Sequence, residues 1–356
     1  MSEPLPQGAV IGILGGGQLG RMLAVAAARL GYETHIYDPD PAAPAFATAR
    51  HGTVAPYDDA GALAAFAESC AVVTYEFENI PPEALDAIEQ TASIHPNRRA
   101  LTLSRDRLTE KTFLRDLGLT TAPFEAVENT ATLATALEAI GTPSILKTRT
   151  LGYDGKGQIR LDTPEDVSGA VDAIAGAPAI LEGFVSFTKE ISVIAARSTT
   201  GAVACYDPGE NVHRNGILHT TTVPAEVTNR DRTDAVLLAG QILNALDYVG
   251  VMGVELFVTK GGLIVNEIAP RVHNSGHWTQ LGCAIDQFEQ HIRAITGLPL
   301  GPATRHTDVV MENLLGDDVL KLPALADENA QIHLYGKSEP RPGRKMGHIN
   351  RLKPTA

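Results

Sequence analysis

The sequence predicts a chain that begins as an α/β domain and continues as an α+β domain. Short apolar runs alternate with helix-like segments through the first hundred residues, whereas strand-like segments around glycine-rich turns dominate the middle. Beyond about residue 300 the chain is rich in proline. We therefore expect a parallel-sheet domain at 1–103, a second domain at 104–298 and a small β-containing C-terminal domain at 299–356.

The first domain is expected to be Rossmann-like. Strands are predicted at 9–15, 33–38, 71–77 and 92–96, because each is a short and mostly apolar run. Helices are predicted between them at 18–31, 61–70 and 81–91. Such alternation is typical of a parallel sheet with right-handed crossovers.

The second domain opens with a helix predicted at 104–118, with Ser104 as its N-cap and Gly118 at its end. Strands are predicted at 144–148, 179–185 and 189–197, and the glycine-rich segment 149–158 separates the first two. We expect a lid subdomain at about 145–210.

The composition excludes several classes of protein. A net charge of −13 disfavours nucleic-acid and anionic-membrane partners, and 5% aromatic residues disfavour a base-stacking platform. No apolar run reaches the roughly 18 residues that a membrane span needs. The three scattered cysteines and the polar first residues favour reduced thiols in a cytoplasmic protein.

A dinucleotide-type fingerprint lies near the N-terminus. Gly15, Gly17 and Gly20 form G-x-G-x-x-G, and Asp38 follows Gly20 by 18 residues. This spacing is typical of proteins that bind NAD, so an NAD-dependent oxidoreductase is one hypothesis. A glycine-rich turn at a helix N-terminus binds any phosphate, however, so the motif alone is weak.

The segment "LGYDGKGQ" at 151–158 carries three glycines around a charge pair. A flexible loop of this kind exposes backbone N–H groups and can close over a phosphate chain, with Lys156 adding charge. Lys147 lies on the preceding strand, where burial would require an anionic partner. The alternative is a surface hairpin with a solvated lysine.

A hairpin is predicted at 254–268, around the three-residue loop Lys260-Gly261-Gly262. If Thr259 faces Leu263, Glu255 faces Glu267 on one side of the sheet. Two opposed carboxylates repel each other, and a divalent cation such as Mg²⁺ removes this repulsion. In the alternative, one glutamate pairs with Arg271 and the other faces solvent.

Three further stretches carry polar side chains. Arg271, His273 and Asn274 follow the hairpin and suggest an anion site, whereas Ser275 and Gly276 disfavour a zinc pair of His273 and His277. Glu76, Glu78 and Asn79 lie at the end of the strand predicted at 71–77, where open α/β sheets place ligands. A turn before the two prolines explains them equally well.

The third stretch, 337–353, holds six basic residues against Glu339 and suggests an anionic ligand or, alternatively, a solvated tail. The basic residues are Lys337, Arg341, Arg344, Lys345, Arg351 and Lys353.

Together these stretches resemble the ATP-grasp superfamily. The segments "ILKT", "GYDGKGQ", "EGFV" and "NEIAPRVHNSGHWTQ" carry that resemblance. Within it, "GGGQLGRM", "YEFENIP", "NSGHWTQ" and "RPGRKMGH" are similar to the N5-carboxyaminoimidazole ribonucleotide synthetase family of purine biosynthesis, over about 10–350. The resemblance implies an ATP-grasp architecture and a ligase that joins bicarbonate to the exocyclic amine of 5-aminoimidazole ribonucleotide, using ATP and Mg²⁺.

The resemblance also implies residue roles. Glu255 and Glu267 would ligate Mg²⁺. For the reaction itself we expect Asp154, Arg271 and Lys345 to be catalytic, with Asp154 as general base because a carboxylate of the lid arrives only on closure. ATP would be bound by Arg107, Lys147, Gly152, Tyr153, Asp154, Gly155, Lys156, Gly157, Gln158, Glu182, Gly183, Phe184, Val185, Glu190, His213, Asn266 and Glu267. The ribonucleotide would be bound by Gln18, Leu19, Glu76, Asn79, Tyr153, Arg271, His273, Asn274, Arg344 and Lys345.

In this interpretation the turn "GGGQLG" holds the 5′-phosphate of the ribonucleotide and does not hold NAD. Many enzymes of the ATP-grasp superfamily have an asparagine two residues after the second metal glutamate, where this chain has Ala269. We expect a homodimer. The alternatives are another ATP-grasp ligase of purine metabolism, an NAD-dependent oxidoreductase, and a catalytically silent binding or scaffold protein.

Overall fold

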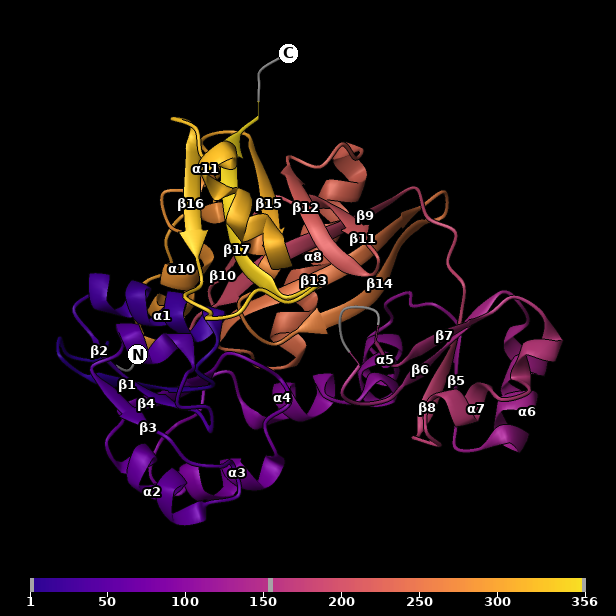
Figure 1. The fold of residues 1–356 in the computed structure, drawn as a ribbon, viewed down its shortest axis with the longest axis horizontal. Coiled ribbons are helices and arrows are strands. Elements are labelled where there is room, and N and C mark those ends of the chain that lie inside the picture. The colour runs from indigo at the N-terminus through magenta and orange to yellow at the C-terminus, as the bar shows by residue number, and fades with distance from the viewer. Residues whose placement is uncertain (1–2, 153–155, 354–356) are drawn as a thin grey trace.

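The computed structural model describes residues 3–152 and 156–353. Three sheets organise these residues (Figure 1): a parallel sheet near the N-terminus, a small antiparallel sheet, and a large sheet that continues to the C-terminal strands. The predicted fold class, α/β followed by α+β, is confirmed.

The N-terminal sheet has the order β3-β2-β1-β4, and all its neighbouring strands are parallel. Its strands are β1 (Val10–Leu14), β2 (Glu33–Tyr37), β3 (His51–Thr53) and β4 (Val72–Tyr75), and its helices are α1 (Gln18–Arg29), α2 (Ala60–Glu68) and α3 (Pro82–Ile88). The strand predicted at 92–96 is wrong, because only Ile94 forms a bridge, with Val73. Sequence analysis missed the short, largely exposed β3.

Two short helices replace the single helix predicted at 104–118. They are α4 (Arg98–Ser104) and α5 (Arg107–Asp116). Ser104 ends α4, so its predicted role as N-cap is wrong. The carboxylate of Asp106 caps α5 instead, because it accepts hydrogen bonds from the backbone N–H groups of Leu108 and Thr109 at 2.9 and 3.2 Å.

The small sheet has the order β5-β8-β6-β7. Its strands are β5 (Phe124–Val127), β6 (Ser144–Thr148), β7 (Gln158–Leu161) and β8 (Ala179–Gly183), accompanied by α6 (Thr130–Ile140) and α7 (Ala170–Ala173). Leu133, Leu146 and Leu181 are fully buried between sheet and helices. This unit begins earlier along the chain than 145, the start of the expected lid subdomain.

The large sheet has the order β14-β13-β9-β11-β12-β15-β17-β16, and β10 pairs with β9. Its strands are β9 (Lys189–Arg197), β10 (Val203–Cys205), β11 (Gly209–Arg214), β12 (Ile217–Val223), β13 (Gly250–Thr259), β14 (Gly262–Ala269), β15 (Val309–Leu315), β16 (Ala330–Leu334) and β17 (Lys345–Leu352). Helices α8 (Asn229–Ala245), α9 (Thr279–Gly282), α10 (Gln287–Thr296) and α11 (Leu322–Leu325) accompany it. The C-terminal strands therefore extend the sheet of the second domain.

Among residues 3–152 and 156–353, no helix is both long and apolar enough to cross a membrane.

Candidate active site

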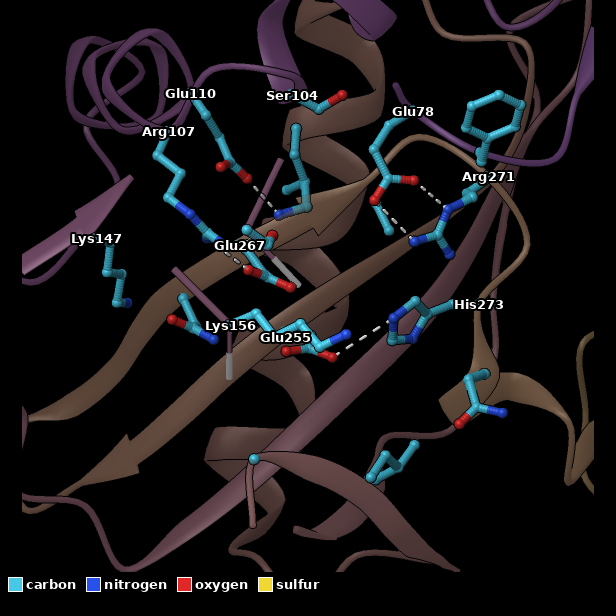
Figure 2. A pocket seen from close by; sticks show the side chains of 18 of the residues that line it. Glu78, Ser104, Arg107, Glu110, Lys147, Lys156, Glu255, Glu267, Arg271 and His273 are labelled. Carbon is cyan, nitrogen blue, oxygen red and sulfur yellow. Dashed lines mark hydrogen bonds and ion pairs between the residues drawn. The ribbon is translucent and has the colours of Figure 1, made fainter. Parts of the chain in front are cut away.

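A cavity of about 550 Å³ lies where the three sheets meet. Glu76 follows β4 of the N-terminal sheet, Lys147 comes from the small sheet, and Glu255, Glu267 and Lys345 come from the large sheet. Figure 2 shows side chains from these separate elements turned toward one space. Residues that are far apart in the sequence therefore share one cavity.

Most of the predicted site residues line this cavity. They are Gln18, Leu19, Glu76, Asn79, Arg107, Lys147, Gly152, Lys156, Gln158, Glu190, His213, Glu255, Asn266, Glu267, Arg271, His273, Asn274 and Lys345. Six predicted residues do not line its wall: Gly157, Glu182, Gly183, Phe184, Val185 and Arg344. Tyr153, Asp154 and Gly155 lie outside the described residues.

The two hairpin glutamates face each other as predicted, although the loop differs. Thr259 pairs with Gly262, so the connection has two residues and the predicted pairing of Thr259 with Leu263 is wrong. Leu256 accordingly pairs with Val265. A β-bulge at Asn266 then shifts the register, so that Glu255 pairs with Glu267.

The glutamate pair forms an acidic patch on the wall of the cavity. Burial and the nearby charge of Glu267 raise the pKa of Glu255 to about 7. Arg107 donates to Glu267 from Nη1 at 3.1 Å, and Nε2 of His273 lies 3.5 Å from Glu255. Burial and Arg271 lower the pKa of His273 to about 3, so this imidazole is neutral. An oxygen-only pair of this kind fits a hard divalent cation such as Mg²⁺.

Arg271 does not pair with either hairpin glutamate, so the alternative proposed for it is wrong. It forms a two-pronged ion pair with Glu78, with distances of 2.5 Å from Nε and 3.0 Å from Nη2 (Figure 2). Burial opposes ionisation of Glu78, but the charge and hydrogen bonds of Arg271 outweigh it and lower the pKa of Glu78. The guanidinium is thereby held at the cavity wall.

Lys147 is not a solvated surface lysine. Its Nζ donates to Oε2 of Glu182 at 3.0 Å, and Nζ of Lys111 lies 3.4 Å from the same oxygen. Burial of Glu182 favours its neutral form, but the two lysines outweigh this and lower its pKa to about 2. The other oxygen, Oε1, is buried without a hydrogen-bond partner among the described residues.

The glycine-rich turn before α1 is already occupied by carboxylates of the chain itself. Glu76 accepts hydrogen bonds from the N–H groups of Gly17 and Gly20 at 2.5 and 2.7 Å, and Asp38 accepts one from Gly16 at 2.6 Å. Because these carboxylates occupy the N–H groups of Gly16, Gly17 and Gly20, the structure disfavours the expectation that "GGGQLG" holds a phosphate.

The basic C-terminal stretch does not form one site. Lys345 lines the cavity, whereas Arg344 donates to the backbone carbonyl of Glu339. Arg341 also pairs with Glu339, and Arg351 pairs with Glu312. Among the described residues of this stretch, Lys345 is therefore the one basic side chain at the cavity that could contact the expected anionic ligand.

Sequence analysis missed several residues of the site. Phe187 and Phe257 stack at 4.6 Å between ring centroids and line the cavity. Glu110 also lines it, and Lys111 lies behind it. These residues carry no local signal in the sequence, whereas Glu78, which also lines the cavity, was expected at the end of its strand without a specific role.

The chain resembles known proteins over almost its whole length. Residues 9–105 match the ribonucleotide synthetase preATP-grasp domain, 112–288 the ATP-grasp domain, and 309–356 the phosphoribosylaminoimidazole carboxylase C-terminal domain. An N5-carboxyaminoimidazole ribonucleotide synthase of Brucella melitensis is 56% identical over 354 residues, which cover 98% of each chain. One of Pseudomonas aeruginosa is 44% identical and covers 95% of this chain and 93% of its own.

Solved structures agree with these matches. The N5-carboxyaminoimidazole synthetase of Staphylococcus aureus complexed with ADP has a TM-score of 0.94 at 37% identity, covering 99% of this chain and 95% of its own. The synthase of Aspergillus clavatus, in complex with ADP and 5-aminoimidazole ribonucleotide, has a TM-score of 0.92 at 33% identity and covers 98% and 95%.

Proposed function

Because the chain belongs to the N5-carboxyaminoimidazole ribonucleotide synthase family, we propose that it carboxylates 5-aminoimidazole ribonucleotide with ATP and bicarbonate. One observation carries this proposal. The bulged hairpin brings two carboxylates into a cavity that is also lined by Lys147 of the small sheet, by Arg271 after β14 and by Lys345 of β17. Such a cavity suits a magnesium-bound triphosphate on one side and an anionic substrate on the other.

The nucleotide half of the site is proposed to lie against the small sheet. Arg107, Lys147 and Lys156 would contact the phosphates, with Gly152 and Gln158 from the glycine-rich segment. Glu182–Val185 would hold the adenine, where the unpartnered Oε1 of Glu182 is an acceptor for its exocyclic amine. Glu190, which forms an ion pair with His213, would accept from the ribose hydroxyls.

The glutamate pair is proposed to be the metal site, with Asn266 at the bulge in β14. Glu255 and Glu267 would hold Mg²⁺, which would neutralise charge on the β- and γ-phosphates. Ala269 supplies no side-chain ligand at the position where related enzymes often have asparagine.

The reaction is proposed to proceed in two stages. A bicarbonate oxygen attacks the γ-phosphorus of ATP while the bond to the β–γ bridging oxygen breaks, which gives carboxyphosphate and ADP. Lys147 and Arg271 would stabilise the charge that develops. Carboxyphosphate then releases inorganic phosphate and CO₂, the amine nitrogen attacks the carbon, and a base removes one proton. The sequence assigns this base to Asp154, which stays a prediction.

The ribonucleotide is proposed to bind on the opposite side, near the N-terminal domain. Gln18, Leu19, Glu76 and Asn79 would face its imidazole and ribose, joined by His273 and Asn274 and, from the sequence, Tyr153. Its phosphate would contact Lys345, with Arg344 behind, because Glu76 fills the glycine-rich turn. The fingerprint therefore supports neither NAD binding nor direct phosphate binding.

One assay tests the function against its alternatives. Purified protein should release phosphate from ATP only when 5-aminoimidazole ribonucleotide and bicarbonate are both present. Another ATP-grasp ligase of purine metabolism would respond to a different substrate, and a silent scaffold to none. An oxidoreductase would instead quench nicotinamide fluorescence, so quenching without phosphate release would overturn the proposal.

The homodimer and the cytoplasmic location stay predictions. Light scattering coupled to size-exclusion chromatography would test the first, because a homodimer has twice the 37.7 kDa mass of the chain. Fractionation of cells that express the native protein would test the second.

A further inference from the structure

The bulge at Asn266 decides which way the side chain of Glu267 points. Without it the register of the hairpin tip would continue, and Glu255 would oppose Asn266. Because side chains alternate between the faces of a strand, Glu267 would then point to the face opposite Glu255. The proposed metal site therefore depends on one extra residue in β14.

β14 is the edge strand of the large sheet, so its outer backbone groups need partners from outside the sheet. The carbonyl oxygen of Thr120 accepts from the N–H group of Val265 at 2.8 Å, and two consecutive residues of α5 supply partners on either side of Glu267. Nζ of Lys111 donates to the carbonyl oxygen of Asn266 at 2.7 Å, and the N–H group of Ile268 donates to Oε1 of Glu110 at 2.5 Å. Figure 2 shows the Glu110 carboxylate beside β14, next to Glu267.

Both α5 residues are only 2% exposed. Burying a carboxylate and an ammonium is costly unless both groups form hydrogen bonds. The contacts with β14 therefore explain how α5 can bury two charged side chains. Lys111 also lies 3.4 Å from Oε2 of Glu182. It therefore links the bulge to the strand that is proposed to hold adenine.

We propose that Glu110 and Lys111 are positioning residues that fix the bulge at Asn266 and thereby aim the Glu267 carboxylate at the metal. The proposal rests on the magnesium site described above, and neither residue needs to touch the nucleotide. Groups that orient a metal ligand from behind typically contribute 10–100-fold in metal affinity or activity.

Two variants and two controls test this role. Glu110→Leu removes the acceptor for Ile268, and Lys111→Met removes the donor to Asn266 at similar length. Glu110→Gln is the matched control, because its amide oxygen still accepts the Ile268 N–H. Lys260→Met, which removes an exposed lysine at the tip of the same hairpin, controls for the loss of a positive charge.

Two readouts separate positioning from general stability. The first is ADP affinity, titrated without metal and at increasing Mg²⁺ concentration. We expect Glu110→Leu and Lys111→Met to need roughly 10–100 times more Mg²⁺ for the same gain in ADP affinity. Metal-free ADP binding by Glu110→Leu should stay within about threefold of that of the unaltered protein, whereas that of Lys111→Met should weaken as well, because Lys111 pairs with Glu182. Both controls should need the same Mg²⁺ as the unaltered protein, within about threefold.

The second readout is backbone hydrogen exchange of the peptide around Ile268 in the metal-free protein. It should be faster in Glu110→Leu and unchanged in Glu110→Gln, because only the first loses the acceptor. If Glu110→Leu does not fold, the Mg²⁺ titration of Lys111→Met tests the proposal, because this variant should show the same increase in the Mg²⁺ needed.

Unchanged Mg²⁺ dependence in Glu110→Leu or Lys111→Met would overturn the positioning role. ADP binding by the unaltered protein that does not depend on Mg²⁺ concentration would also overturn the positioning role. A failure of the proposed function looks different: phosphate release would not depend on the ribonucleotide, while Mg²⁺-dependent ADP binding would still respond to these variants.

Discussion

Glu78 and Arg271 form a two-pronged ion pair that joins the N-terminal domain to the loop after β14. Their side chains are 28% and 18% exposed, so the pair is neither a solvated surface contact nor a fully buried one. The guanidinium lines the same cavity as Glu76, Asn79 and the two hairpin glutamates.

Replacing Glu78 should therefore destabilise the fold. We expect Glu78→Ala to lower the free energy of unfolding by about 2 kcal/mol, between the values typical of exposed and buried pairs, because Arg271 keeps its charge without a partner. The double variant Glu78→Ala with Arg271→Met should recover part of this loss. Urea unfolding of both variants tests the pair, and equal losses in the two would contradict it.

Removing one hairpin carboxylate should weaken metal binding selectively. We expect Glu267→Gln to reduce Mg²⁺-dependent ADP affinity at least about tenfold, because the proposed ion then has one carboxylate ligand. Calorimetric titration of ADP at fixed Mg²⁺ concentrations measures this. Glu138→Gln, on the exposed face of α6, should change nothing. An intact Mg²⁺ response in Glu267→Gln would reject the paired-carboxylate site.

The close packing at Gly20 predicts opposite outcomes for two glycine-to-alanine changes. A Cβ at Gly20 would lie 2.6 Å from the carbonyl oxygen of Gly15, whereas a Cβ at Gly240 in α8 meets nothing closer than 3.9 Å. We expect Gly20→Ala to destabilise by about 1–3 kcal/mol and Gly240→Ala to stabilise by about 0.5–1 kcal/mol. Thermal unfolding of the two variants, side by side, checks the signs.

Lys345 should matter to the ribonucleotide more than to ATP. If it contacts the substrate phosphate, Lys345→Ala should raise the KM for 5-aminoimidazole ribonucleotide at least about tenfold and leave the KM for ATP within about twofold. Arg341→Ala removes an exposed cation of the same stretch and should leave both constants unchanged. Steady-state kinetics that show equal effects on both substrates would contradict this assignment.

A stack of three histidines predicts acid sensitivity. His348 lies between His277 and His333, with ring centroids 4.4 and 4.5 Å apart. Burial lowers the pKa of all three, that of His333 to about 4. Below pH 6.5 the unfolded chain therefore gains protons that the folded protein does not, and folding stability falls as pH decreases.

The expected slope is up to about 1.4 kcal/mol per pH unit for each histidine. Urea unfolding between pH 7.5 and 5 measures it, and His333→Gln should make the slope shallower by about 1 kcal/mol per pH unit. His51→Gln, an exposed histidine of β3, is the control. An identical slope in His333→Gln and the unaltered protein would contradict the prediction.

By itself, the sequence determined the alternation of strands and helices in the first domain and the hairpin that carries Glu255 and Glu267. These follow from local periodicity and turn chemistry, which act over a few residues. Even there, the predicted three-residue loop is wrong, and the bulge at Asn266 compensates for the shorter connection.

Only the tertiary structure decided which groups are partners. Arg271 pairs with Glu78, 193 residues away, Lys111 holds Asn266 across 155 residues, and Glu76 fills a turn 56 residues before it. Local spacing cannot specify such contacts, because they arise when separate sheets pack around one cavity and buried charges must find partners. The sequence motifs indicated the chemistry of the site, and the packing of the sheets determined which charged groups pair with each other.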